Sequence, residues 1–168
     1  MKTFLYIIVV LLLASCTASK STFSPAKKYT KAQVEKDYTL YQNLLEAHHP
    51  GLYWYTSKDS MDYFLDWGRQ QLKDSMTEPE FRKVLSFVTA KINCGHTTVR
   101  PSKTWGKYGD TARGPKIFPF SVKIWDEAMV VTSNLNRRDS ILTRGTVITA
   151  INGKSKQFLA DTMFNYIS

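Results

Sequence analysis

The spacing of apolar residues changes once along this 168-residue chain, and that change constrains the fold more than any other feature. Between Lys31 and Ile92, apolar residues recur every three or four positions, as on one face of a helix. From Ile117 to Ile124 they recur at every second position, as in a half-buried strand. A helical part followed by a strand-rich part predicts an α+β fold with two small domains, residues 31–114 and 115–168.

Three helices are expected in the first domain. The first begins at Lys31 after the N-cap Thr30 and ends at "HHPG", because Pro50 disfavours helical geometry in the residue before it. The second begins near Ser57 or Asp59. The residues expected on the buried faces of the three helices are Val34, Tyr38, Tyr41, Leu45, Met61, Phe64, Leu65, Gly68, Leu72, Phe81, Val84, Leu85, Val88 and Ile92.

The third helix has the clearest start. It begins at "TEPE", where Thr77 and Glu80 fit a capping box. It ends at "NCG", where Gly95 can take the left-handed cap conformation. The following "HTTVR" alternates as a short strand does, and residues 101–115 are expected to form a loop because they are rich in glycine and proline.

The second domain is predicted to be a small sheet followed by a helix. Its first strand contains Pro119, which favours an edge position or a bulge. The second strand is "AMVVTS". The third, "RGTVITAINGKS", ends at the Asn152–Gly153 turn, after which Ser155 caps a last helix. So short a unit buries little surface by itself, so we expect an incomplete domain.

The first residues indicate export. Residues 1–15 contain Lys2, a short apolar run and then small residues, the pattern of a signal peptide. A buried N-terminal helix is the alternative. "LASC" resembles the lipobox of bacterial lipoproteins, in which the cysteine, here Cys16, carries the lipid; an ordinary cleaved signal remains possible. Residues 16–30 are then a flexible tether. The predicted location is the bacterial cell envelope, lipid-anchored and facing the periplasm or at the outer membrane.

The charge does not predict a nucleic-acid partner. The formal net charge is +9, but the basic residues are scattered, and the longest runs are pairs such as Lys27–Lys28. No basic stripe alternates with aromatic residues as on a nucleic-acid-binding surface. A solvated face, or attraction to anionic lipid or to an acidic cell-surface polymer, accounts better for this charge.

Two segments resemble a known family. "EAHHPGLYWYTS" with "MTEPEFRKVLSFVTAKINCGHTTV", and "FPFSVKIWDEAMVVTS" with "SILTRGTVITAINGKS", are similar to the amino-terminal half of exported serine peptidases of the C-terminal processing (tail-specific) and tricorn-core family. The resemblance implies a helical domain, then a PDZ-like domain, then a catalytic domain with a serine nucleophile and a lysine base. It covers roughly residues 34–168.

The resemblance implies a non-catalytic role for this portion. No glycine-rich turn presents a serine here, and Ser155–Lys156 is a helix start rather than a nucleophile. We therefore expect no catalytic residue, cofactor or metal in this chain. A PDZ-like part would bind a peptide or protein substrate by strand addition. The alternatives are a structural spacer and a freestanding lipoprotein peptide-binding module without enzymatic activity. The oligomeric state is left open.

Cys94 and His96 in "INCGHTTV" are the most reactive residue types outside the signal. A thiolate–imidazole dyad lacks a third group to orient the ring. A zinc site could use Cys94, His96, His48 and His49, but no C-x-x-C frame supports it. The favoured interpretation is a domain corner in which Cys94 is a small buried residue and His96 is hydrogen-bonded. The family resemblance implies a further option, in which His96 helps to shape the cleft of the catalytic domain.

The aromatic run "LYWY", Leu52 to Tyr55, has two interpretations. It could form a platform for carbohydrate or peptide, or it could plug the core after the turn. The core plug is favoured, because aromatic side chains gain most from burial.

Overall fold

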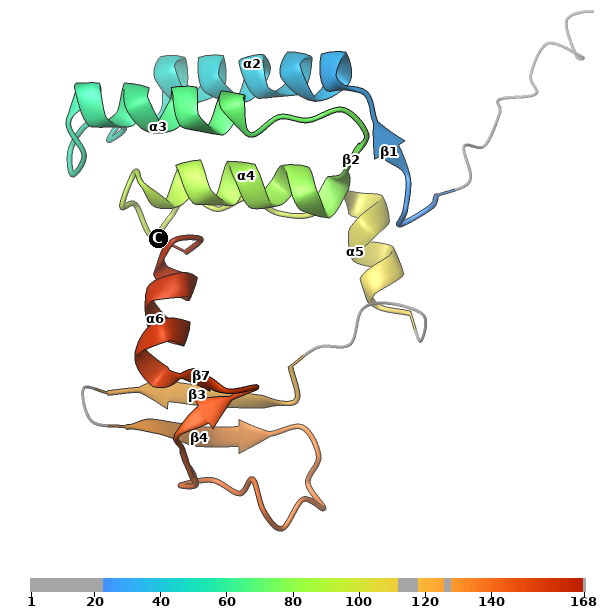
Figure 1. The fold of residues 1–168 in the computed structure, drawn as a ribbon, viewed down its shortest axis with the longest axis vertical. Helices are drawn as coiled ribbons and strands as arrows, with labels where there is room; N and C mark the ends of the chain where they lie inside the picture. The colour runs from blue at the N-terminus through green and yellow to red at the C-terminus, as the bar shows by residue number, and fades with distance from the viewer. Residues whose placement is uncertain (1–22, 112–117, 126–127, 168) are drawn as a thin grey trace, which may run out of the picture.

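The protein is described from a computed structural model that places residues 23–111, 118–125 and 128–167 (Figure 1). The predicted signal peptide, Cys16 and the first part of the predicted tether lie outside the described residues. The chain has an α+β fold, as predicted, with a helical part followed by small antiparallel sheets. None of the helices in the described part is long and apolar enough to cross a membrane.

Three stacked helices form the body of the helical part (Figure 1). They are α2 (Lys31–His48), α3 (Lys58–Gln70) and α4 (Glu78–Ala90). The predicted start signals are confirmed. The side chains of Thr30 and Ser57 accept hydrogen bonds from the backbone in the first turns of α2 and α3. Thr77 and Glu80 form the predicted capping box of α4.

Two contiguous hydrophobic clusters fill the space between these helices. The fully buried members are Val34, Tyr38, Leu45, Leu52, Met61, Leu65, Leu72, Met76, Val84, Val88 and Ile92. The Tyr38 hydroxyl lies inside this core and donates a 2.7 Å hydrogen bond to the carbonyl of Leu65. That bond satisfies a buried polar group which would otherwise destabilise the core. The helical spacing in the sequence therefore predicted the core correctly.

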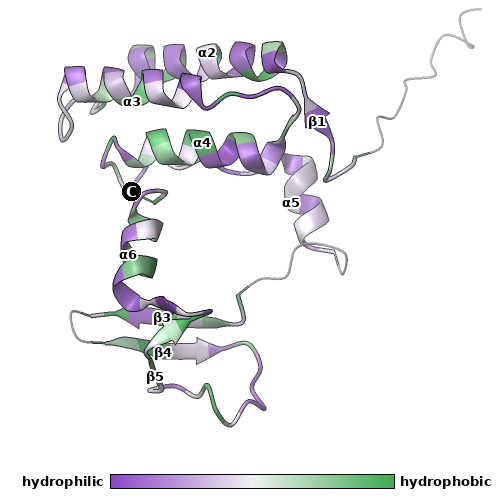
Figure 2. Ribbon diagram, viewed as in Figure 1, coloured by the Kyte–Doolittle hydropathy of each residue, from purple (hydrophilic) through white to green (hydrophobic). Residues whose placement is uncertain are grey.

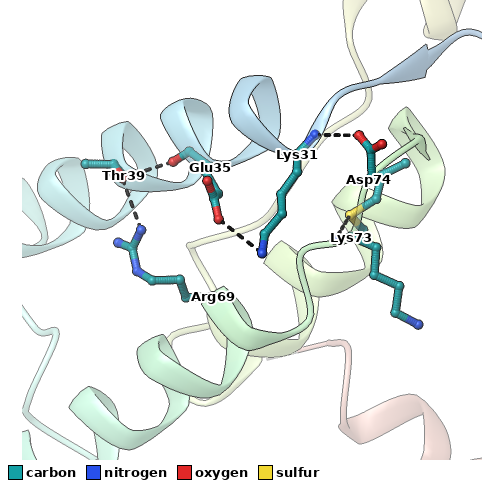
Figure 3. A network of polar contacts seen from close by, with 7 residues as sticks. Lys31, Glu35, Thr39, Arg69, Lys73 and Asp74 are labelled. Atoms are coloured by element: carbon teal, nitrogen blue, oxygen red, sulfur yellow. Dashed lines mark hydrogen bonds and ion pairs between the residues drawn. The ribbon is translucent and has the colours of Figure 1, made fainter.

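Polar contacts fix how α2 sits on α3 at the surface (Figure 3). The backbone N–H of Lys31 donates to Asp74 Oδ1 at 3.0 Å, and Arg69 donates to Thr39 Oγ1 at 3.2 Å. The ammonium of Lys31 also lies 3.7 Å from Glu35. Exposed pairs of this kind contribute little stability, so they orient the helices more than they hold them together.

Residues 23–30, which composition alone places in the tether, contact the helical part. Strand β1 (Lys28–Tyr29) pairs antiparallel with β2 (Met76–Thr77). Phe23 packs edge-on against the indole of Trp105, with 6.0 Å between ring centroids. Both contacts bridge long stretches of sequence, which no local pattern reveals.

Three local expectations after α4 are wrong. The predicted loop 101–115 contains a fourth helix of this part, α5 (Lys103–Gly109). "HTTVR" is not a strand, because none of the strands in residues 23–111, 118–125 and 128–167 pairs with it. The left-handed residue after α4 is Asn93, with φ 55°, rather than Gly95. Asparagine tolerates this conformation better than most residues.

The second part is strand-rich, as expected. Its elements are β3 (Phe120–Ile124), β4 (Met129–Asn134), β5 (Val147–Ile148), β6 (Ala150–Ile151), β7 (Lys154–Ser155) and α6 (Lys156–Phe164). The strands β3, β4 and β5 form one antiparallel sheet with β3 at its edge, and a bulge falls at Ser121/Val122. Both features agree with Pro119 just before β3.

The predicted third strand is broken into three short ones. Strand β5 completes the first sheet, whereas β6 and β7 form a separate hairpin. The hairpin turn is Asn152–Gly153, as predicted, with φ 49° and 73°. Positive φ at both turn residues matches the twist of the flanking strands. Ser155 then caps α6 by accepting from Phe158 N–H.

Candidate functional site

The two stretches that make up the first segment of the family resemblance, one at the end of α2 and one after α4, meet at one corner of the helical part. His49, from the end of α2, contacts Thr97, from the segment after α4; His49 Nε2 and Thr97 Oγ1 are 2.8 Å apart. Thr56 also reaches this segment, because its hydroxyl donates to the carbonyl of Lys91. Residues about 40 positions apart in the sequence are thus held together by side-chain hydrogen bonds.

Cys94 lies in this corner, half-buried against the core cluster of α2, α3 and α4. The Thr97 hydroxyl, and to a smaller extent the backbone N–H of His96, lower the pKa of the Cys94 thiol. A donated hydrogen bond has this effect because it stabilises the thiolate. Thr97 therefore connects Cys94 to His49.

The imidazole of His96 takes no part in this arrangement. Its side chain is exposed, and its backbone N–H, rather than its ring, contributes to the environment of Cys94. His48 is exposed as well. The structure therefore connects His49, rather than the ring of His96, to the cysteine through Thr97. In the sequence, the only indication of the contact between His49 and Thr97 was that "HHPG" and "GHTT" each contain a repeated polar residue.

One ring nitrogen in the corner lacks a partner among the described residues. His49 Nδ1 is buried without a hydrogen bond, while Nε2 faces Thr97. When the Thr97 hydroxyl donates its proton to Cys94, the hydroxyl oxygen accepts a hydrogen bond from Nε2–H of His49. In a neutral imidazole, Nδ1 is then the nitrogen without a proton. No group of three or more potential metal ligands occurs in the described part of the chain.

The aromatic run "LYWY" divides between core and surface. Leu52 is buried in the core cluster, so the plug interpretation holds for this residue alone. Trp54 and Tyr55 are 74% and 70% exposed, and Tyr53 is exposed too. The turn at Gly51 sends Leu52 inward and turns the next residues out. An exposed tryptophan beside two tyrosines is a surface feature that the plug interpretation missed.

The strand-rich part has a small core and an apolar surface. Its buried apolar residues in the described segments are Met129, Val131 and Ala160. Hydrophobic residues are visible on α6 and on the strands beneath it (Figure 2). The large exposed apolar residues in this part are Phe118, Trp125, Leu135, Ile141, Val147, Phe158, Met163, Phe164 and Ile167. Concentrated apolar exposure is typical of a surface that meets another polypeptide.

Strand β3 combines this surface with a backbone edge that pairs with no other strand in the described part of the chain. The backbone N–H of Trp125 donates to Ala128 at 2.8 Å, which closes the β3–β4 hairpin. Because partners alternate along an antiparallel pair, Lys123 faces β4 and Val122 and Ile124 direct their backbone groups outward. Such a row of unpaired groups is a template for an added strand.

The start of α6 lies beside the end of β3. The ammonium of Lys156, the first residue of α6, donates a 3.1 Å hydrogen bond to the carbonyl of Trp125. Phe158, in the first turn of α6, is half exposed. The Lys154 ammonium lies 4.6 Å from the centre of its ring. An exposed strand edge and an apolar helix are therefore brought close together.

No protein-family model matches this chain, and a search of curated proteins likewise finds no match.

Proposed function

We propose that this chain is the non-catalytic, substrate-engaging portion of an exported, lipid-anchored serine-type peptidase, and that its PDZ-like part binds extended peptides at β3. The observation that carries this proposal is the free edge of β3 beside the start of α6. Main-chain hydrogen bonds to such an edge supply affinity, and neighbouring apolar side chains supply selectivity.

The peptidase part of the proposal depends on the resemblance of the two quoted segments. His49 and Thr97 both belong to the first of those segments, and their contact supports reading that segment as one structural unit. The corner would then present the peptide-binding part to a catalytic domain. The competing function is a freestanding lipoprotein module that binds peptides without cleaving them, which the same strand edge supports.

Peptide binding at β3 is tested by removing one outward backbone donor. Peptides selected from a random displayed library are labelled and titrated by fluorescence anisotropy against the chain carrying Cys16→Ser. Val122→Pro removes the outward N–H while the Lys123 bonds to β4 remain, as proline is tolerated on an edge strand. We expect affinity to fall about tenfold, the equivalent of one hydrogen bond. Val122→Thr keeps the N–H and serves as the matched control.

Two outcomes separate the competing ideas. Equal affinity of the Val122→Pro and Val122→Thr proteins would rule out strand addition at β3. The peptidase and freestanding-module hypotheses are separated by the coding sequence downstream of Ser168. An in-frame continuation with a Gly-flanked serine and a later lysine supports the peptidase, whereas a stop codon followed by an unrelated gene supports the module.

A further inference from the structure

A pocket of about 340 Å³ lies in the helical part, and none of its lining residues belongs to the strand-rich part. Val34 of α2 and Phe81 and Leu85 of α4 contribute apolar side chains to its lining. Two arginines, Arg82 and Arg100, belong to the same lining. A concave apolar site with a few polar groups is the usual form of a small-ligand pocket.

Arg82 has unused hydrogen-bonding capacity. Its Nη1 is buried and has no hydrogen-bond partner among the described residues. The closest carboxylate oxygen, Oε1 of Glu78, is 4.0 Å away, which is too far for a hydrogen bond. The Arg82 side chain as a whole remains 28% exposed. Arg82 therefore lines the pocket, and its Nη1 has no hydrogen-bond partner within the described part of the protein.

Glu78 cannot easily supply the missing acceptor, because its carboxylate is engaged elsewhere. Its Oε1 accepts from the backbone N–H of Ser102 at 2.8 Å, and its Oε2 accepts from the Ser102 hydroxyl at 2.7 Å. Ser102 is the N-cap of α5 and accepts in turn from Trp105 N–H. Moving Glu78 toward Arg82 would release the start of α5.

The two cations and the two carboxylates in the lining balance, so the pocket disfavours a ligand with more than one negative charge. Arg100 is exposed and adds a second cation, whereas the carboxylates of Asp37 and Glu78 also belong to the lining. A dianionic phosphate would meet both carboxylates, but a single carboxylate can pair with the planar fork of Arg82. The apolar lining then accommodates the stem that carries this carboxylate.

We propose that this pocket binds a monocarboxylate with an apolar stem. Two sources share that chemistry, an alkyl carboxylic acid and the apolar last residue of a peptide. The site lies outside β3 and does not depend on strand addition there. Its occupant would contact α2, α4 and the segment before α5 together.

The test compares each carboxylate with its neutral amide. N-acetyl-leucine and hexanoate are titrated by NMR against the chain carrying Cys16→Ser, beside N-acetyl-leucinamide and hexanamide. We expect one or both acids to bind at least about tenfold more tightly than the matching amide, since the ion-paired hydrogen bonds are lost. Tighter binding of N-acetyl-leucine assigns the site to peptide ends, and tighter binding of hexanoate assigns it to alkyl acids.

Variants locate the binding site. Arg82→Gln is expected to lower the affinity for the acid about tenfold or more, whereas Arg138→Gln removes an exposed guanidinium in the strand-rich part and is expected to leave it unchanged. If Arg82→Gln fails to fold, Arg100→Gln at the exposed rim provides the second variant. Equal binding of acid and amide by the unaltered pocket, binding of neither acid, or undiminished binding by Arg82→Gln would each overturn the proposal.

Discussion

At the scale of single residues, Gly68 has the tightest surroundings of the glycines whose neighbours are known. It lies on α3 at the point where the side chains of α2 and α4 come closest. A Cβ added there would lie 2.3 Å from the hydroxyl oxygen of Tyr38 and 2.7 Å from a methyl carbon of Val88. Tyr38 cannot move away freely, since its hydroxyl is bonded to the carbonyl of Leu65. The absence of a side chain at Gly68 therefore allows the three helices to pack.

Gly68→Ala is expected to destabilise the protein by about 3 kcal/mol, because an extra methyl group in a filled core forces its neighbours apart. The measurement is the free energy of unfolding from urea titration. Gly106→Ala on α5 is the matched control, because nothing lies within 4 Å of the added Cβ there. It is expected to be neutral or slightly stabilising. Similar effects of both substitutions would contradict the packing explanation.

At the scale of elements, the start of α4 is held by a charged capping residue. The Glu80 carboxylate accepts from the backbone N–H of Thr77 at 2.8 Å and from its hydroxyl at 2.7 Å. The backbone hydrogen bond from Thr77 is the largest cause of the lowered pKa of Glu80. A lowered folded-state pKa means that this carboxylate stabilises the fold above its unfolded pKa of about 4.3, and that the contribution is lost as the pH falls through the folded value.

Glu80→Gln should therefore lower the melting temperature at pH 6, and the difference should shrink as the pH falls, because the native carboxylate loses its charge. Thermal melts of the native and substituted proteins from pH 6 to pH 3 measure the difference. Glu46→Gln is the control, since Glu46 accepts from the exposed side chain of Gln42. A difference between native and Glu80→Gln proteins that stays constant from pH 6 to pH 3 would argue against the charge of this cap.

Helices whose ends are marked by nearby capping residues were predictable from the sequence. Elements that depend on contacts with residues far away in the sequence were not. The starts of α2, α3, α4 and α6 follow from capping residues within one turn. Helix α5 has seven residues and two glycines, and its N-cap Ser102 is held by Glu78, 24 positions earlier. "HTTVR" alternates as a strand does, but alternation cannot supply a neighbouring strand.

The candidate sites show the same division. The free edge of β3 follows from Pro119, which a central strand would not tolerate. The contact of His49 with Thr97 joins the end of α2 to the segment after α4, and the pocket at Arg82 forms only when α2 and α4 pack side by side. Neither arrangement has a periodic signature in the sequence, because it depends on how helices pack after they form.

At the scale of the whole molecule, the C-terminal end of α6 connects the strand-rich part to the helical part. Tyr166 packs edge-on against Phe87 of α4, with 5.9 Å between ring centroids, and the Lys83 ammonium lies 5.5 Å from the Tyr166 ring centre. Asn165 accepts a 2.8 Å hydrogen bond from the ammonium of Lys91. At this point the two parts meet through a pair of aromatic rings and a few polar groups.

Because this contact is small, its loss should free α6 without unfolding the helical part. Tyr166→Ala is expected to raise the rate of amide hydrogen exchange in α6 by about tenfold, while exchange in α2 and α3 stays unchanged, since local opening costs less than global unfolding. Tyr55→Ala, at a 70% exposed tyrosine of the helical part, is the control. Exchange measured by mass spectrometry distinguishes the alternatives. Faster exchange throughout α2, α3 and α4 would mean that Tyr166 supports the helical core itself, and unchanged exchange in α6 would mean that the other contacts hold the two parts together.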